Sequence, residues 1–307
     1  MTTNKSFDSR RYKLKKKITT KLYEKIKYLI NKILSLFNLK IIKILSSIDE
    51  KNSFIENKDI QNIKINLLSK EIKKFFSGLN INMSNSFLRK NIIEFEKFFY
   101  SYNYNKTGGF GYNNAIFLFL FCKKINPEII WESGVFKGFT TLIIDKSTNS
   151  NSRIFCHDVS FKNINYKSKK ATYLEEDIET NFNPVLAKKK SIFFFDDHVS
   201  HLKRFKFIIK NNIKYSLFDD DVSITSIISD GEPPLPSLNI IKNNYNLFNN
   251  GKINWSYEGL KRSLKLNKNS INYNNLMKNY RYSQIPNLSG ITGYKRFSPF
   301  SFLIKKN

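Results

Sequence analysis

The chain has 307 residues, of which 41% are hydrophobic and 15% aromatic, which is enough apolar material for a buried core and excludes a wholly disordered protein. No apolar run reaches the roughly 18 residues of a membrane-spanning helix, and the start lacks the cleavage site of a secretory signal. Both cysteines, Cys122 and Cys156, lie within apolar runs, so we expect buried thiols in a reducing, cytoplasmic compartment rather than a disulfide.

The net charge of +27 raises the question of a nucleic-acid partner, and its distribution along the chain bears on the answer. Residues 1–45 carry a net charge of +11, residues 240–307 carry another +11, and residues 46–239 carry only +5. The basic excess therefore lies outside the central part of the chain. No known nucleic-acid-binding motif occurs, so we do not expect such a partner. A lysine-rich composition would also raise the charge without any partner.

Residues 1–45 have the pattern of a basic amphipathic helix. Apolar residues recur at steps of three and four, with lysines between them, at Leu14, Ile18, Leu22, Ile26, Leu29, Ile33 and Leu36. Two interpretations are open. The apolar face packs on the core, or it lies on an anionic membrane surface and makes the protein peripheral at the inner face of the membrane.

Residues 46–107 form the next region, which we expect to be a linker followed by helices. The stretch 46–61 is polar, and helices are predicted near 62–77 and 86–101. A glycine-containing loop comes next, and Ala115–Cys122 is apolar throughout, which predicts a buried helix.

Between residues 125 and 222 the chain alternates between short strands and helices. The predicted strands are Glu128–Trp131, Arg153–His157, Ala171–Leu174, Ser191–Phe195 and Ile213–Phe218. Helices are clearest at Gly138–Lys146 and Val199–Asn211, and Phe302–Ile304 is predicted as the last strand. This alternation predicts an α/β fold with a doubly wound, mostly parallel sheet, a helical N-terminal extension and a site at the carboxyl ends of the strands.

Gly134 and Gly138 mark the strongest local feature, a turn that joins the first predicted strand to a helix. Glycine permits a positive φ and a close approach of the backbone to a ligand, and the helix start offers free N–H groups to a carboxylate or phosphate. The turn lacks the Gly-Lys-Ser/Thr of a phosphate-binding loop and the G-x-G-x-x-G of dinucleotide-binding folds. A tight turn without a ligand is the alternative.

The residues of this turn, Glu132-Ser-Gly-Val-Phe-Lys-Gly-x-x-Thr141, resemble the first motif of class I S-adenosylmethionine (SAM)-dependent methyltransferases. The resemblance is closest to the macrocin O-methyltransferase-like group, which methylates hydroxyls of sugars. It implies a Rossmann-like methyltransferase domain over 108–307, with a core at 125–222 and a substrate region at 223–307. It also implies SAM as cofactor, held by Glu132, Ser133, Gly134, Gly138, Asp158 at the ribose and Asp177 near the adenine.

Acidic residues also follow the fourth and fifth predicted strands. In the resembled group, acids at these two ends bind a divalent cation, which implies Mg²⁺ held by Asp196 or Asp197 together with Asp219 or Asp220. Oxygen ligands suit Mg²⁺, which would favour deprotonation of a hydroxyl. His198 and Asp196 are the candidate catalytic residues, because an imidazole is the usual base for a hydroxyl nucleophile. The alternative is that these aspartates cap helix starts.

Together these patterns predict a SAM-dependent O-methyltransferase that acts on a hydroxyl of a sugar, a glycan or a similar small acceptor. Two other classes remain open at this point. One is a non-catalytic methyltransferase-like binding protein at a membrane surface. The other is a different nucleotide-cofactor enzyme on a Rossmann sheet, such as a nicotinamide oxidoreductase, although the third glycine of that motif is missing.

Overall fold

A computed structural model describes residues 58–101, 109–180, 182–187, 189–227, 234–243, 252–257, 260–265, 278–294 and 298–306. The amphipathic segment 1–45 and the polar stretch up to residue 57 lie outside the described residues, so the predicted membrane helix stays a prediction. The chain divides into two units. The smaller unit contains an antiparallel strand pair, β6 (Lys252–Tyr257) and β7 (Leu260–Lys265), and the larger one contains everything described below.

The larger unit is built around one sheet, in which seven strands are described, in the order β3-β2-β1-β4-β5-β9-β8. Their bounds are β1 (Ile129–Ser133), β2 (Arg153–His157), β3 (Ala171–Leu174), β4 (Ser191–Phe195), β5 (Tyr215–Phe218), β8 (Tyr280–Gln284) and β9 (Ser301–Lys305). The first five are parallel, whereas β9 runs antiparallel to both of its neighbours. The predicted mostly parallel, Rossmann-like sheet is confirmed, and its order reverses between β1 and β4.

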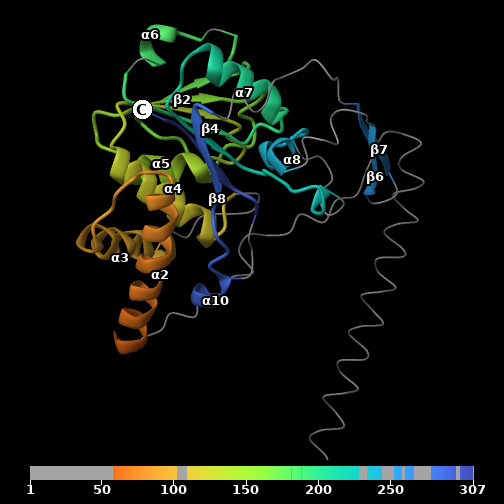
Figure 1. Ribbon diagram of the computed structural model, residues 1–307. Helices are drawn as coiled ribbons and strands as arrows, with labels where there is room; N and C mark the ends of the chain where they lie inside the picture. The colour runs from red at the N-terminus through yellow and green to blue at the C-terminus, as the bar shows by residue number, and fades with distance from the viewer. Residues whose placement is uncertain are drawn as a thin grey trace, which may run out of the picture. The chain divides into compact units, whose positions relative to one another are not determined.

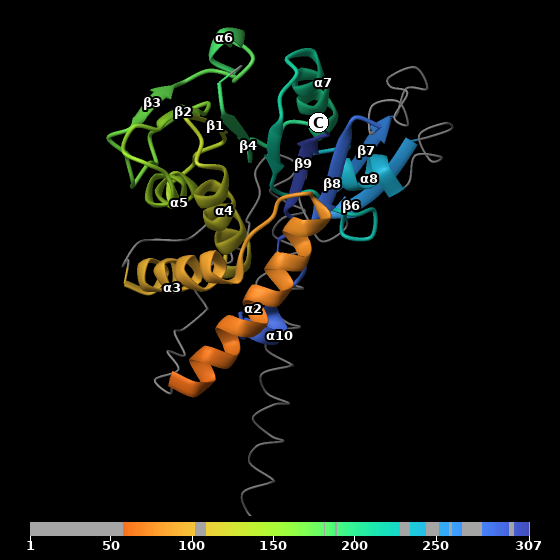
Figure 2. The ribbon, with the colours of Figure 1, turned by 60° about the vertical axis from the view of Figure 1, so that its left-hand side comes forward.

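The described helices cover both faces of this sheet. Their bounds are α2 (Lys58–Gly78), α3 (Asn85–Ser101), α4 (Tyr112–Ile125), α5 (Phe139–Ser147), α6 (Pro184–Ala187), α7 (His201–Lys210), α8 (Leu238–Asn243) and α10 (Ser289–Thr292). Helices α4 and α5 lie on one face and α7 on the other (Figures 1 and 2). Among the described residues no helix is both long and apolar enough to cross a bilayer.

The strands form because short apolar and aromatic runs can be buried on both faces of a parallel sheet. All five residues of β4, Ser-Ile-Phe-Phe-Phe, are buried. Side chains alternate between the faces, so Phe194 joins the core under α4 and α5, whereas Phe193 stacks on Trp131, with ring centroids 5.7 Å apart, and contacts Phe207 of α7. Helix α4 is buried from Tyr112 to Cys122, as its apolar sequence predicts.

Helices α2 and α3 pack against α4 as a further layer (Figure 2). Phe76 of α2 reaches Phe302 of β9, with ring centroids 5.6 Å apart. A buried polar group ties the three helices together, because Glu96 of α3 accepts hydrogen bonds from Lys64 at 2.5 Å and from the Tyr112 hydroxyl at 2.6 Å. This layer is therefore part of the core of the larger unit.

Candidate active site

A cavity of about 540 Å³ opens at the carboxyl ends of the strands, where the strand order reverses. Its walls come from residues at or just after the ends of β1, β2, β3 and β4, together with Arg204 of α7. Ligands of open α/β sheets bind at this place, because the loops of neighbouring strands separate there. The predicted site residues Ser133, Gly134, Asp158 and Asp177 line it.

Gly134 and Gly138 both have left-handed backbone conformations, with φ of +86° and +82°. A Cβ atom on Gly134 would lie 2.0 Å from the carbonyl oxygen of Asp196, and one on Gly138 would lie 2.5 Å from that of Tyr166. The close approach that the sequence indicated is therefore an approach to the protein's own backbone. The approach at Gly134 brings the ends of β1 and β4 into contact beside the cavity.

The first backbone N–H groups of this turn are already bound by a side chain. Val135 and Phe136 donate their N–H groups to Oδ2 of Asp158, at 2.7 and 2.9 Å, and Ser160 donates to Oδ1 at 3.3 Å. Asp158 thus holds the glycine turn while it lines the cavity. In a phosphate-binding loop such N–H groups would bind a phosphate, whereas in this turn they bind a carboxylate of the protein itself.

The cavity wall is acidic. Five carboxylates line it, namely Asp158, Glu176, Asp177, Asp196 and Asp197, against a single arginine, Arg204. That arginine is 1% exposed and is surrounded by acids. Its guanidinium donates to Asp177 at 2.8 and 3.0 Å, to Glu179 at 2.7 Å and to Asp197 at 2.9 Å. Its charge is therefore neutralised internally, and the wall carries an excess of negative charge.

Asp177, predicted to face the adenine, is one partner of this arginine. Burial opposes the ionisation of Asp177, but the hydrogen bonds and charge of Arg204 outweigh it and hold the pKa of Asp177 well below its usual value. A second cation, Lys203, lies 3.3 Å from the same carboxylate. Asp177 is therefore ionised and fixed in place before any ligand binds.

Three ligand atoms converge at the rim of the cavity. They belong to Asp196, His198 and Asp220 and lie within 4.8 Å of one another. Nδ1 of His198 is 4.0 Å from Oδ2 of Asp220. The pKa of Asp196 is raised well above its ordinary value, first by burial and then by repulsion from Asp219 and Asp220. A divalent cation would remove that repulsion, and two carboxylates with one imidazole are a suitable donor set.

The other two predicted metal ligands, Asp197 and Asp219, bind protein groups instead. Asp197 accepts a hydrogen bond of 2.5 Å from the Ser133 hydroxyl in addition to the guanidinium of Arg204. Asp219 is buried and accepts a bond of 3.0 Å from the hydroxyl of Ser298. Of the four predicted aspartates, the structure thus brings together Asp196 and Asp220, and it adds His198.

His198 and Asp220 share an unusual backbone conformation. Both are left-handed, with φ of 55° and 51°, as is Phe136 at the cavity wall, with φ of 47°. For residues other than glycine this conformation costs about 1 kcal/mol or more, and it persists where the surroundings enforce it. Strained positions of this kind concentrate at ligand sites, and two of the three converging ligands have them.

A buried contact joins the segment after β4 to the segment after β5 and holds His198 and Asp220 in these positions. His201 follows His198 by three residues, Asp221 follows Asp220 directly, and Nδ1 of His201 lies 3.4 Å from Oδ1 of Asp221. The Tyr282 hydroxyl donates to Oδ2 of the same carboxylate at 2.5 Å. His201 is therefore apart from the converging atoms and joins the two segments that carry them.

Glu132 and His157 are both buried, but they differ in their relation to the cavity. Glu132 bonds Thr141 of α5 at 2.7 Å, lies off the cavity wall, and has a pKa raised to about 8 by burial. His157 does line the cavity and is 1% exposed. Burial lowers the pKa of His157, so its imidazole is neutral at pH 7.

No protein-family model matches this chain, and no curated protein matches it by sequence. Solved structures do match by fold. The O-methyltransferase TomG from Streptomyces achromogenes, solved with SAM, is 12% identical, with 77% of this chain and 96% of TomG covered and a TM-score of 0.43. An O-methyltransferase from Bacillus cereus is 12% identical, with 79% and 100% covered and a TM-score of 0.40. A methyltransferase from Podospora anserina is 11% identical, with 84% and 100% covered and a TM-score of 0.38.

At these identities and TM-scores, what those proteins bind and do is not carried over to this chain. The site residues that sequence reasoning missed are Arg204, Asp221 and Tyr282. Arg204 lies in a helix among other basic residues, and nothing in its local pattern sets it apart. Asp221 is the last of three consecutive aspartates, and only the direction of its side chain separates it from Asp219 and Asp220.

Proposed function

We propose that this chain is a SAM-dependent O-methyltransferase that acts on a hydroxyl of a sugar or a similar small acceptor. The observation that carries this proposal is the acidic cavity at the strand-order reversal, whose glycine turn has its N–H groups bound by Asp158. The residues of that turn are the ones that resemble the first methyltransferase motif.

The charge of the cavity favours SAM over a phosphate-bearing cofactor. SAM carries a positive sulfonium and an ammonium group and has no phosphate, whereas a nicotinamide dinucleotide carries a negative pyrophosphate. Like charges at a few ångströms repel by about 1 kcal/mol even in bulk water and more strongly in a partly buried site. Apart from Asp196, whose pKa is raised, four carboxylates line the wall and Arg204 is already neutralised, so a pyrophosphate would meet an excess of negative charge there.

The residues present fit SAM. Its bound form would supply a methyl group on a positively charged sulfur. Ser133 and Gly134, at the end of β1, line the wall. Asp158 and Asp177 offer carboxylate oxygens to hydroxyl or amino groups. His157 offers a neutral, buried imidazole at the wall, which suits recognition of an uncharged polar group.

The acceptor side of the site would be the rim where Asp196, His198 and Asp220 converge. These residues would hold a divalent cation that lowers the pKa of an acceptor hydroxyl and orients it. With the cation bound, the basic nitrogen of His198 would be occupied and the hydroxyl proton would leave to solvent. Without the cation, the His198 imidazole, which is more than half exposed, can accept that proton. Orientation of the hydroxyl would supply most of the acceleration, up to about 7–11 kcal/mol in favourable systems.

The direct test is transfer of tritiated methyl from SAM to a panel of monosaccharides and sugar-bearing small molecules, with and without EDTA. We expect transfer to at least one hydroxyl acceptor and its loss in EDTA. Full turnover in excess EDTA would show that the reaction needs no divalent cation and would leave His198 as the proton acceptor. Binding of S-adenosylhomocysteine without transfer to any acceptor would instead support the non-catalytic alternative.

A further inference from the structure

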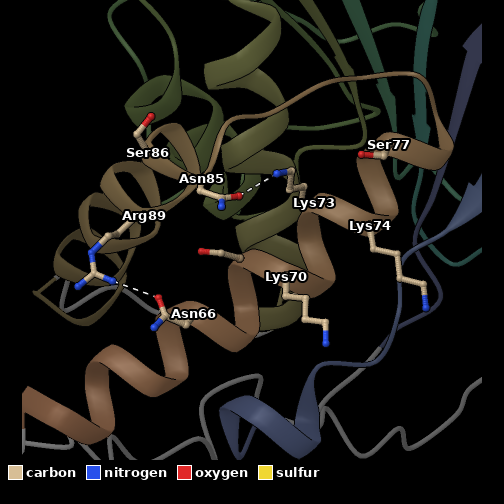
Figure 3. Close-up of a pocket in the computed structure, with 9 residues that line it drawn as sticks. Asn66, Lys70, Lys73, Lys74, Ser77, Asn85, Ser86 and Arg89 are labelled. Carbon is tan, nitrogen blue, oxygen red and sulfur yellow. Dashed lines mark hydrogen bonds between the residues drawn. The ribbon is translucent and has the colours of Figure 1, made fainter.

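A basic groove lies between α2 and α3, in the helical layer that the methyl-transfer proposal does not use. Its volume is about 730 Å³, and Figure 3 shows the side chains around it. Four cations line it: Lys70, Lys73 and Lys74 of α2 and Arg89 of α3. Every other described lining residue is an asparagine or a serine, so among the described residues no carboxylate lines the groove with these charges.

The hydrogen bonds inside the groove leave its positive charge in place. Arg89 donates to Asn66 at 3.2 Å and to Asn62 at 2.6 Å, and Lys73 donates to Asn85 at 2.9 Å. All three acceptors are neutral amides. Lys70 and Lys74 extend outward from α2 in Figure 3. A partner that binds at this groove must therefore supply negative charge.

The same face of α2 also exposes large apolar side chains. Ile63 is 59% exposed and Leu67 is 46% exposed. Ile63, Leu67, Lys70 and Lys74 are spaced by four, three and four residues, so they form one stripe along the helix. The core-facing residues of α2, including Leu68, Ile72 and Phe76, form the opposite stripe. Helix α2 thus has a second, outward face that carries Asp59 in its first turn, continues through these apolar residues and ends basic.

This combination selects one kind of partner. A nucleic acid would engage the cations and gain nothing from Ile63 and Leu67, whereas an uncharged apolar partner would leave the cations unpaired. An anionic lipid surface satisfies both, because apolar side chains enter the acyl boundary while lysines reach the headgroups. We propose that the outward face of α2, with the groove beside it, docks on an anionic phospholipid membrane. This surface is separate from residues 1–45 and independent of the methyl-transfer proposal.

The first test is cosedimentation of the full-length protein with phosphatidylglycerol vesicles and with neutral phosphatidylcholine vesicles. We expect Lys70→Gln/Lys74→Gln to lower the partition coefficient on phosphatidylglycerol by on the order of 10-fold or more, since each basic residue near an anionic leaflet contributes about fivefold. The matched control is Lys210→Gln/Lys214→Gln, which removes the same charge from a second basic hollow at the amino ends of β4 and β5. An equal loss in both variants would mean that only net charge matters and would overturn the proposal.

The second test asks whether the apolar end of the stripe enters the lipid. Both native cysteines are buried, so Leu67→Cys can be labelled selectively with a polarity-sensitive fluorophore. We expect a blue shift on phosphatidylglycerol vesicles that persists at 0.5 M NaCl once the protein is bound, and none on phosphatidylcholine. The absence of a fluorescence shift, together with an equal loss of vesicle and duplex-RNA binding in Lys70→Gln/Lys74→Gln, would identify the groove as a general polyanion site. That result would overturn the membrane assignment. Unchanged melting temperatures confirm that the variants are folded.

Discussion

The cavity at the carboxyl ends of the strands and the groove between α2 and α3 have opposite charge in one molecule. In the part of the chain that the structure describes, five carboxylates and one arginine line the first, and four cations and no carboxylate line the second. The chain as a whole has 52 basic and 25 acidic residues. A lysine-rich composition explains basic surfaces without any function, but it works against an acidic cavity. The cavity is therefore the stronger indication of a selected ligand, and the groove needs its apolar stripe as a second argument.

The largest effect is expected from a substitution that disrupts the backbone beside the acidic cavity. Gly134→Ala would place a Cβ atom 2.0 Å from the Asp196 carbonyl oxygen at a φ of +86°, so the ends of β1 and β4 must separate. We expect a loss of about 4 kcal/mol or more in the free energy of unfolding, measured by urea denaturation. Gly290→Ala, which meets nothing within 4 Å, is the matched control. A loss of under 1 kcal/mol in Gly134→Ala would refute this packing.

The next largest effect is expected from replacing Arg204, the cation among the described residues of the cavity wall. Arg204→Gln would leave Asp177, Glu179 and Asp197 facing one another, at an expected loss of about 3 kcal/mol at pH 7. Lys203→Gln is the control, because Lys203 is half exposed and should contribute under about 1 kcal/mol. Similar losses in the two variants would show that the buried guanidinium has no special role.

The same variant predicts a pH dependence with a definite sign. The pKa of Asp177 is lowered in the folded protein, so its contribution is present above the unfolded pKa, near ~3.9, and is lost as the pH falls through the folded pKa. The stability difference between the wild type and Arg204→Gln should therefore be full from pH 5 to 8 and narrow below about pH 4. A difference that widens as the pH falls would contradict the assignment.

A smaller effect distinguishes the aspartates at the cavity rim. Asp196→Asn removes a carboxylate from a crowded acidic cluster, so the metal-free protein should gain about 0.5–2 kcal/mol in stability. We also expect millimolar Mg²⁺ or Mn²⁺ to raise the melting temperature of the wild type but not that of Asp196→Asn. Asp219→Asn should keep that rise, since Asp219 bonds Ser298. If Asp219→Asn loses it and Asp196→Asn keeps it, the ligand assignment is wrong.

Much of the fold could be predicted because parallel strands leave a strong local signal. Runs such as Ser191–Phe195 are apolar after their first residue, and a turn or an acid follows each of them. Strand β8, Tyr280-Arg-Tyr-Ser-Gln284, was missed because its residues are mostly polar and half-buried, and only its pairing with β9 makes it a strand. The strand pair β6–β7 was missed in the same way, within an Asn- and Lys-rich stretch.

The candidate site, like the fold, could be predicted only in part. Sequence locates acids at strand ends, but the direction of each side chain depends on partners that are distant in the chain. Asp197 turns to Arg204 and Ser133, and Asp221 turns to His201 and Tyr282, which leaves Asp196 and Asp220 at the rim. Asp158 was placed correctly at the end of β2, but its bonds to the glycine turn depend on a backbone conformation that no local pattern shows.

The central claim is that the acidic cavity selects a cofactor without phosphate. Isothermal titration calorimetry of the full-length protein with S-adenosylhomocysteine and, separately, with NAD tests it directly, because both ligands carry adenosine and only NAD carries a pyrophosphate. We expect saturable binding of S-adenosylhomocysteine with a Kd on the order of micromolar, about −8 kcal/mol, and no measurable heat with NAD at 1 mM. Saturable binding of NAD, with none of S-adenosylhomocysteine, would contradict the account.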